Sequence, residues 1–329
     1  MMRTAMTRVA MTTRFDSLRL VCLLLAASLV GVPLPTQAAD PAPVPALKAR
    51  LAAKVPLTGL VRAGDVLVAV GDYGTVVRST DSGRTWIQAA VPVSTLLTAV
   101  HFADAQRGWA VGHGGVILVS TDGGASWTVQ QVLADKPVLL SVHFVSADQG
   151  YAVGAYGTAW RTVDGGGNWM PMTVGSGPDA DMHLNHIFST RNGVLFAAAE
   201  TGLAFRSTDG GETWNSLATG VSGSLWSGLE GVDGEVVLLG MSGRVLSSRD
   251  GGDSWQVHES ASEQSLTGAV LAADGSLIVV GSGGLILRGG ALSAEIRADR
   301  QNLAAVQFAP DGVLVLAGQL GVERLGSDK

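Results

Sequence analysis

Five aspartates recur in one sequence context and are the first residues to examine for chemistry. Each lies in an eight-residue segment of the form Ser/Thr-x-Asp-x-Gly-x-x-Trp, which we name a box; the five are Asp81, Asp122, Asp164, Asp209 and Asp250. Carboxylates bind hard cations when several converge, but these occur once per repeat and are expected to lie in separate structural units. An aspartate followed by glycine is typical of a tight turn, because its carboxylate accepts backbone N–H groups and glycine adopts positive φ without a clash. We therefore interpret the boxes as structural turns.

Four arginines stand three residues before the box aspartate or its equivalent position: Arg78, Arg161, Arg206 and Arg288. Together the four side chains could form a continuous patch. Alternatively, each stem covers apolar surface while the charged head holds a neighbouring turn. Val119 and Ser247 interrupt the series, so the sequence leaves both interpretations open.

The spacing of the box tryptophans indicates which elements position these side chains. The intervals between successive box tryptophans are 41 to 45 residues, the length of a four-stranded propeller blade; these residues are Trp86, Trp127, Trp169, Trp214 and Trp255. After the last box the first half of the pattern returns twice, and Arg288-Gly289-Gly290-Ala291 replaces the sixth box. The sequence thus predicts an all-β fold over residues 57–329, a seven-bladed β-propeller of four-stranded antiparallel blades.

The seventh blade runs out of chain before its fourth strand, which would leave an open edge. Residues 40–56 begin as a Pro/Ala linker and continue into a segment of Leu, Ala and Val interrupted by Lys48, Arg50 and Lys54. We predict that residues 47–55 supply the strand that closes the last blade. The alternative is a short helix packed over the rim.

His101 and His143 occupy the same position in the first strands of two neighbouring blades, and Gln307 occupies it in the seventh. First strands line the central channel, where imidazoles could bind a metal. No carboxylate shares this position, so hydrated channel histidines are the favoured interpretation. We expect no metal and no other cofactor.

Residues 1–39 are predicted to be a secretory signal peptide, which would make the protein periplasmic or secreted. Four arginines precede an apolar run at residues 20–32, and small residues follow at 36–39. Cys22 is the only cysteine and lies in this segment. Removal of residues 1–39 leaves 18 basic and 27 acidic residues, and this excess of negative charge argues against nucleic-acid binding. The mature protein is expected to be a monomer that does not insert in the membrane.

The hairpins of the first three blades share the form Val-Gly-x-x-Gly, for example at residues 70–74 and 153–157. Together with the boxes they resemble the photosystem II stability/assembly factor-like propellers. The resemblance implies seven blades and a non-enzymatic scaffold that binds a protein during assembly of a membrane complex. It also implies, for members in non-photosynthetic bacteria, an association with exporters of the RND type.

Box repeats also occur in sialidases, so a secreted glycan-binding protein or sialidase-like hydrolase is the alternative. Such enzymes need three converging arginines, a tyrosine activated by glutamate, and an aspartate acid/base. The chain has only Tyr73, Tyr151 and Tyr156, and each has an equivalent place in a repeat. We therefore expect no catalytic site.

The tips of the hairpins between second and third strands should gather on the face opposite the boxes. Varied side chains on a repetitive frame are where a binding site is expected. The tip residues are Asp72, Tyr73, His113, Tyr156, Glu200 and Gln319. In the resembled family arginine clusters are associated with partner binding, so the resemblance adds the four arginines to these tips as predicted partner-binding residues.

Overall fold

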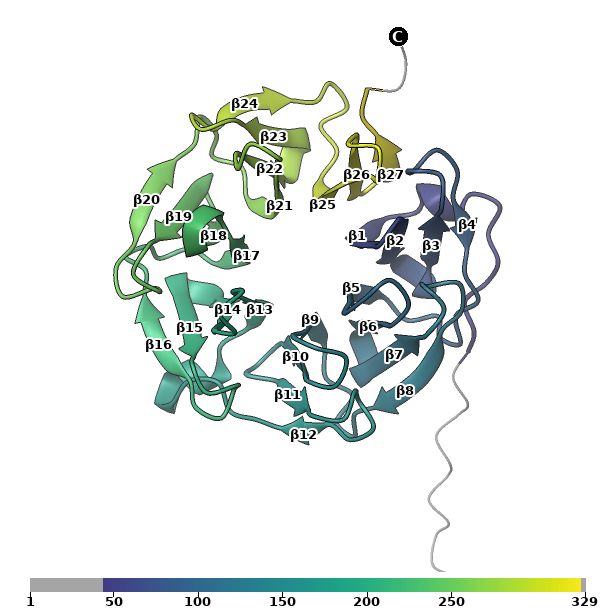
Figure 1. Ribbon diagram of the computed structural model, residues 1–329, viewed down its shortest axis with the longest axis horizontal. Helices are drawn as coiled ribbons and strands as arrows, with labels where there is room; N and C mark the ends of the chain where they lie inside the picture. The colour runs from purple at the N-terminus through teal and green to yellow at the C-terminus, as the bar shows by residue number, and fades with distance from the viewer. Residues whose placement is uncertain (1–43, 327–329) are drawn as a thin grey trace, which may run out of the picture. The chain divides into compact units, whose positions relative to one another are not determined.

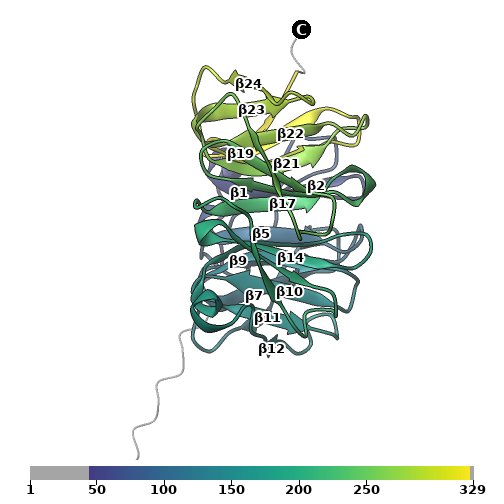
Figure 2. The ribbon, with the colours of Figure 1, turned by 90° about the vertical axis from the view of Figure 1, so that its left-hand side faces the viewer.

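The computed structural model describes residues 44–326, which form seven antiparallel sheets arranged in a ring around a central channel (Figure 1). Each sheet is one blade, and its first strand lies innermost. In the side view the inner strands β1, β5, β9 and β17 run across the thickness of the ring (Figure 2). The predicted seven-bladed all-β propeller is confirmed.

Successive blades take successive strands of the chain. Blade one comprises β1 (Leu57–Ala63), β2 (Val66–Gly71), β3 (Val76–Ser79) and β4 (Ile87–Gln88). Blade two comprises β5 (Leu97–Phe102), β6 (Gly108–Gly112), β7 (Val116–Ser120) and β8 (Thr128–Val132). Blade three comprises β9 (Leu139–Phe144), β10 (Gly150–Gly154), β11 (Ala159–Thr162) and β12 (Met170–Pro171). Blade four comprises β13 (Leu184–Ser189), β14 (Leu195–Ala199), β15 (Leu203–Ser207) and β16 (Asn215–Ala218).

The remaining three blades follow the same order. Blade five comprises β17 (Leu225–Glu230), β18 (Val236–Gly240), β19 (Arg244–Ser248) and β20 (Gln256–Glu259). Blade six comprises β21 (Leu266–Leu271), β22 (Leu277–Gly281), β23 (Leu285–Arg288) and β24 (Ser293–Ile296). Blade seven comprises β25 (Leu303–Phe308), β26 (Leu314–Gly318) and β27 (Gly321–Arg324). Short 3₁₀ turns are η1 (Ala52–Lys54), η2 (Asp72–Gly74), η3 (His113–Gly115), η4 (Gly177–Asp181), η5 (Glu200–Gly202), η6 (Val232–Gly234) and η7 (Ser282–Gly284).

A polar side chain near the start of the inner strand links neighbouring blades at the channel. Every inner strand begins with a buried leucine and an irregular register at that end. The next residue is Thr58 in blade one and Thr98 in blade two. The Thr58 hydroxyl donates to the Leu97 carbonyl of the following blade at 2.6 Å, and Thr98 donates to Leu139 at 2.7 Å. Thus the irregular backbone at the channel is satisfied across the blade junction.

The hydrophobic core is divided among the junctions between blades. At the junction of blades two and three, Trp109 stacks on Phe144 with ring centroids 3.4 Å apart. Phe144 in turn meets the edge of Trp169, the box tryptophan of its own blade. Because each blade buries both faces against neighbours, no blade can bury its apolar residues alone.

The predicted closing strand is wrong. Within the described residues, blade seven has three strands, and the segment before β1 forms the 3₁₀ turn η1 and no strand. Ala52 is buried against Ala317 and Val322 of blade seven, while the Ala46 N–H donates to the Val91 carbonyl of blade one. The segment is held by blade one at its start, so it crosses the blade junction and does not run along β27.

Several predictions concern residues outside this part of the chain. The predicted signal peptide, residues 1–39, and the start of the predicted linker, residues 40–43, lie outside the described residues. Among residues 44–326, no helix has the length and apolar character needed to cross a bilayer.

Candidate functional site

The box aspartates accept hydrogen bonds within their own turns. The Asp122 carboxylate accepts the Ser120 hydroxyl at 2.8 Å, the Ser126 N–H at 2.9 Å and the Ser126 hydroxyl at 2.5 Å. Equivalent bonds from the residue four places later lower the pKa of Asp81, Asp164 and Asp209 to about 2. Across the described residues, no group of three His, Cys, Asp or Glu side chains could hold a metal ion.

One backbone carbonyl of each box bonds to the preceding blade. It belongs to the fourth box residue, and we name it the box carbonyl. Its donors come from second, third or fourth strands of the neighbouring blade. The pairs are Arg78 Nε to Gly123 O (2.9 Å), Gln130 Nε2 to Gly165 O (2.9 Å), Tyr151 Oη to Gly210 O (2.8 Å), Arg206 Nη1 to Gly251 O (2.7 Å) and Arg324 Nη1 to Ser82 O (2.5 Å). Boxes therefore join blades as well as turning the chain.

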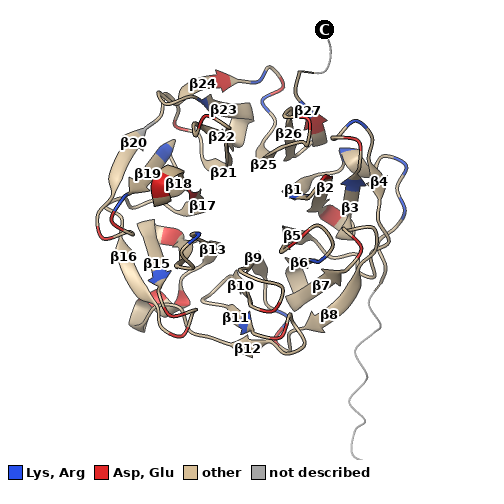
Figure 3. Ribbon diagram, in the orientation of Figure 1, with Lys and Arg blue, Asp and Glu red and all other residues tan. Residues whose placement is uncertain are grey.

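The arginines predicted to form a patch are distributed over separate junctions. Arg161 pairs with Glu212, and Arg206 pairs with Asp253 in addition to its box carbonyl. Arg288 lies 3.6 Å from Glu295 in its own blade. Figure 3 shows acidic and basic segments around the whole ring, with no sector that collects the basic ones. The structure does not bring these arginines together.

Two further arginines at the junctions were missed by the sequence analysis. Arg324 pairs with Val315 between strands as Arg78 pairs with Val68, so the two arginines occupy the same position in their blades. This equivalence was the sequence signal that could have found Arg324. Arg107 Nη2 reaches the Gly165 carbonyl at 2.9 Å from the turn before β6. That position carries no arginine in the other boxed blades, so no repeat signal could have found it.

Two tyrosines on the hairpin tips are exposed to solvent. The exposed fractions of Tyr73 and Tyr156 are 72% and 80%. Their φ angles are 55° and 52°, in the left-handed region that glycine occupies at the corresponding tips Gly114 and Gly283. A non-glycine residue there costs about 1–2 kcal/mol. Because the β2–β3 hairpin and the box turn lie at opposite ends of β3, these tips occupy the face opposite the boxes.

The other predicted tip residues are arranged in smaller groups on this hairpin-tip face. The rings of Tyr156 and His183 meet edge to face with centroids 4.6 Å apart. The backbone N–H of His183 donates to the Glu200 carboxylate at 2.9 Å. Asp72 lies beside Tyr73 in η2, whereas His113 and Gln319 belong to the separate hairpins of blades two and seven. The exposed apolar tips Met241 and Leu320 were missed.

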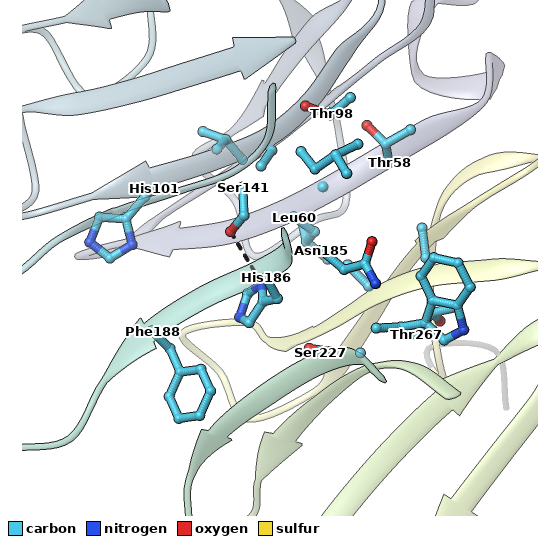
Figure 4. Close-up of a pocket in the computed structure, with 18 of the residues that line it drawn as sticks. Thr58, Leu60, Thr98, His101, Ser141, Asn185, His186, Phe188, Ser227 and Thr267 are labelled. Atoms are coloured by element: carbon cyan, nitrogen blue, oxygen red, sulfur yellow. Dashed lines mark hydrogen bonds between the residues drawn. The ribbon is translucent and has the colours of Figure 1, made fainter. Parts of the chain in front are cut away.

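The central channel contains a cavity of about 320 Å³ lined by the inner strands of all seven blades. Side chains from different blades, including Thr58, Asn185 and Thr267, border it (Figure 4). Trp226 also borders the cavity and remains 40% exposed. None of the lining residues is Asp, Glu, Lys or Arg.

Three histidines from successive blades form one wall of this channel. The rings of His101 and His143 meet edge to face at 4.6 Å, and His186 lies 3.3 Å from the Ser141 hydroxyl (Figure 4). Removal from bulk water lowers the pKa of His101 and His186 to about 4, and it lowers that of His143 well below the usual value. His186 was missed because it stands two positions earlier in its strand than the other two.

The tyrosine that lies deepest is unsuited to nucleophilic catalysis. Tyr151 is buried, its hydroxyl donates to the Gly210 carbonyl at 2.8 Å, and it accepts the Gln149 amide. Burial raises the pKa of its hydroxyl. The hydroxyl is thus committed to a blade junction and faces no substrate cavity.

Two stretches of the chain, residues 77–138 and 130–225, match the family model described as photosynthesis system II assembly factor YCF48. This part of the chain, residues 77–225, resembles the photosystem II assembly factor-like propellers. A structure of YCF48 bound to D1 peptide is 19% identical with a TM-score of 0.68, covering 87% of this chain and 100% of that one. YCF48 from Cyanidioschyzon merolae is 16% identical with a TM-score of 0.65, covering 86% and 97%.

The fold of this YCF48-like propeller also occurs in an enzyme. A streptogramin B lyase structure has a TM-score of 0.71 at 9% identity and covers 83% of this chain and 93% of its own. The uncharacterized protein YkuO of Bacillus subtilis is 37% identical over 73 residues, 22% of this chain. That match spans 24% of YkuO, about a quarter of its length. At these levels of identity the solved structures establish the fold alone.

Proposed function

We propose that this YCF48-like propeller is an exported, non-catalytic scaffold that binds a protein partner through its hairpin-tip face. The observation that carries the proposal is the pair of exposed tyrosines, Tyr73 and Tyr156, held in a backbone conformation that disfavours them. Strain at an exposed position is a reason to infer function there. Tyrosine is also enriched at interfaces, because its ring is apolar and its hydroxyl remains hydrogen-bonded.

The opposite face is less suited to binding, because its recurring charged groups already have partners. Arg78 and Arg206 donate to box carbonyls, and Arg161 pairs with Glu212. A partner that engaged these arginines would have to break the contacts that join blades. The hairpin tips can be covered without any such loss.

The resemblance to YCF48 supports a protein partner, since a similar YCF48 structure holds a D1 peptide. The arginine-rich start and apolar run of the N-terminus support export, which places the partner at or near a membrane. A membrane complex, or a transporter of the RND type, is the class of partner we propose. Binding without turnover is supported by the buried Tyr151 and by the uncharged lining of the channel.

The test is crosslinking and affinity capture of the tagged full chain in the envelope of its own host. Tyr73→Ala with Tyr156→Ala should reduce recovery of the specific partner at least tenfold. The matched control is Ile87→Ala with Val163→Ala, which removes exposed apolar groups from the outer edge and the box face. Both double variants should melt within a few degrees of the parent.

Two results would contradict the proposal. One is a partner recovered equally well by the tyrosine variant and by the parent. The other is turnover of sialosides or aryl glycosides that persists through purification and disappears when a single carboxylate is replaced. The second result would establish the hydrolase alternative.

A further inference from the structure

Among residues 44–326, the junction between blades five and six lacks the box-carbonyl contact found at five other junctions. The turn between β23 and β24 contains only residues 289–292, so blade six has no box and no box carbonyl. On the facing blade, Ser247 pairs with Val237 in the ladder as Arg206 pairs with Phe196. The donor position that carries arginine in blade four therefore carries a short hydroxyl side chain here.

A cavity of about 310 Å³ opens at this junction. Its lining includes Val237, Val245, Ser247, His258 and Leu292. Val68 in blade one and Tyr151 in blade three occupy the strand position equivalent to Val237. At those junctions the second glycine of the next blade's box packs on that residue. A Cβ added to Gly124 would lie 2.9 Å from Val68, and one on Gly211 would lie 2.8 Å from Tyr151. Leu292 of the β23–β24 turn packs in the same apolar cluster as Val237 and Val245, so the cavity opens beside the site that a Gly-Gly turn fills at other junctions.

The polar groups of the cavity also have counterparts that hold a box. His258 follows Trp255 by three residues, as Gln130 follows Trp127, and Gln130 donates to the box carbonyl of the next blade. His258 Nε2 and Ser247 Oγ lie 3.0 Å apart and share one hydrogen bond. When the imidazole Nε2–H donates to Ser247, the serine hydrogen is available to a carbonyl entering from outside.

The rim of the cavity carries a cation suited to an acidic turn. At the junction of blades four and five, Arg206 bonds both the box carbonyl and Asp253, the residue after the second glycine. At the junction of blades five and six, Arg249 borders the cavity, and its side chain is 84% exposed. Its Nε lies 3.2 Å from Glu235 Oε1. An acidic residue after a Gly-Gly pair would complement this guanidinium.

We propose that this cavity is a docking site for an acidic glycine-rich turn, of the type Asp-Gly-Gly-Glu, presented by a partner polypeptide. The partner turn supplies the box that blade six lacks: its glycines enter the cavity beside Leu292 and its carbonyl accepts from Ser247. A second copy of this chain cannot act in this way, because the box carbonyls of its described residues are already bonded to their preceding blades. The site lies on the box face and is independent of the hairpin-tip face.

The test uses a disulfide-cyclised peptide that contains Ser-Thr-Asp-Gly-Gly-Glu-Thr-Trp, the sequence of residues 207–214. Binding to the whole protein is measured by calorimetry, and methyl NMR shifts should appear at Val237 and Val245. A peptide with both glycines replaced by alanine should bind at least tenfold more weakly, because its Cβ atoms meet the cavity floor.

Protein variants separate the proposed contacts from general effects. Ser247→Val should weaken peptide binding about tenfold without unfolding the blade, since blade two carries Val119 at this position. Arg249→Glu should weaken it similarly, whereas the control Ser222→Val, exposed on the opposite face, should leave it unchanged. Replacing residues 289–292 by a full box should abolish binding and raise the free energy of unfolding.

The proposal is overturned if the glycine peptide does not bind at millimolar concentration, or if Ser247→Val binds it as the parent does. Equal affinity for the alanine peptide would also overturn it. These results are distinguishable from failure of the hairpin-tip proposal, because Tyr73→Ala with Tyr156→Ala leaves this cavity intact.

Discussion

At the residue scale, the carboxylate and the indole of a box have different structural roles. The carboxylate of Asp122 organises the turn through bonds to Ser120 and Ser126. Trp127 is buried, contacts Phe102 edge to face and donates its ring N–H to the Gly124 carbonyl at 3.2 Å. The turn is exposed to water on one side, whereas the indole fills space within the blade junction.

This difference predicts unequal costs of removing the two side chains. Trp127→Ala should lower the free energy of unfolding by about 3–5 kcal/mol, because the blades on either side restrict collapse of the cavity. Asp122→Ala should lower it by about 1–2 kcal/mol through lost turn bonds. Chemical unfolding measures both, with Asp135→Ala on an exposed loop as the control. Variants that both unfold like the control would show that the box is not structural.

The channel histidines predict a loss of stability in mild acid. The folded-state pKa of His101 is about 4, below its ordinary value of 6.5. Between pH 6.5 and 4 the unfolded chain therefore binds more protons than the folded chain, and the free energy of unfolding falls as pH falls. The loss from pH 7 to pH 5 should be about 1–2 kcal/mol for each such histidine.

Urea unfolding at pH 7 and pH 5 measures this loss. His101→Gln with His143→Gln should retain most of its stability at pH 5, whereas His113→Gln, on an exposed hairpin tip, should lose stability as the parent does. The box carboxylates do not contribute to the loss between pH 7 and pH 5. The pKa of Asp81 falls from 3.8 to about 2 on folding, so the stability that it contributes is lost only at lower pH. A double variant as acid-sensitive as the parent would contradict the assignment.

At the element scale, strands and turns were predictable because each repeats a local pattern. Alternating apolar residues define the strands, and the box specifies its turn through bonds among neighbours in sequence. The segment at residues 47–55 has no repeat counterpart, and its Ala-rich composition suits a strand or a helical turn equally. Its conformation is decided by the junction it crosses, where Ala52 packs on blade seven.

The same distinction applies to the candidate site. Tyr73 and Tyr156 were identified from the hairpin pattern alone, because a tip follows from two strands and a glycine. The partners of Arg161 and Arg206 lie 51 and 47 residues away in the next blade, so the sequence could not decide between a patch and a junction role. The cavity beside Ser247 was invisible for the same reason, although the missing sixth box was its sequence signal.

At the scale of the whole molecule, the ring closes through side chains and one 3₁₀ turn. Arg324 donates to the Ser82 carbonyl and pairs with Asp311, which in turn pairs with Arg84 of blade one. On the other face, the Ala53 carbonyl approaches Gly321 so closely that a Cβ there would lie 2.0 Å from the oxygen. The first and last blades are thus held together on both faces without a shared strand.

Two glycines of blade seven test this closure. Gly321 and Gly312 have φ angles of 86° and 81°, so alanine at either site is strained by a similar amount. Only the Cβ at Gly321 meets another segment, since the one at Gly312 would meet nothing within 4 Å. Gly321→Ala should therefore lower the free energy of unfolding by about 1–3 kcal/mol more than Gly312→Ala, through displacement of η1. The turn η1 contacts the end of the edge strand β27, so its displacement exposes that end, and light scattering should show association of Gly321→Ala alone. Equal unfolding free energies and equal masses for the two variants would mean that η1 does not close the ring, and that Arg324 and the packing of β25 and β26 on β1 suffice.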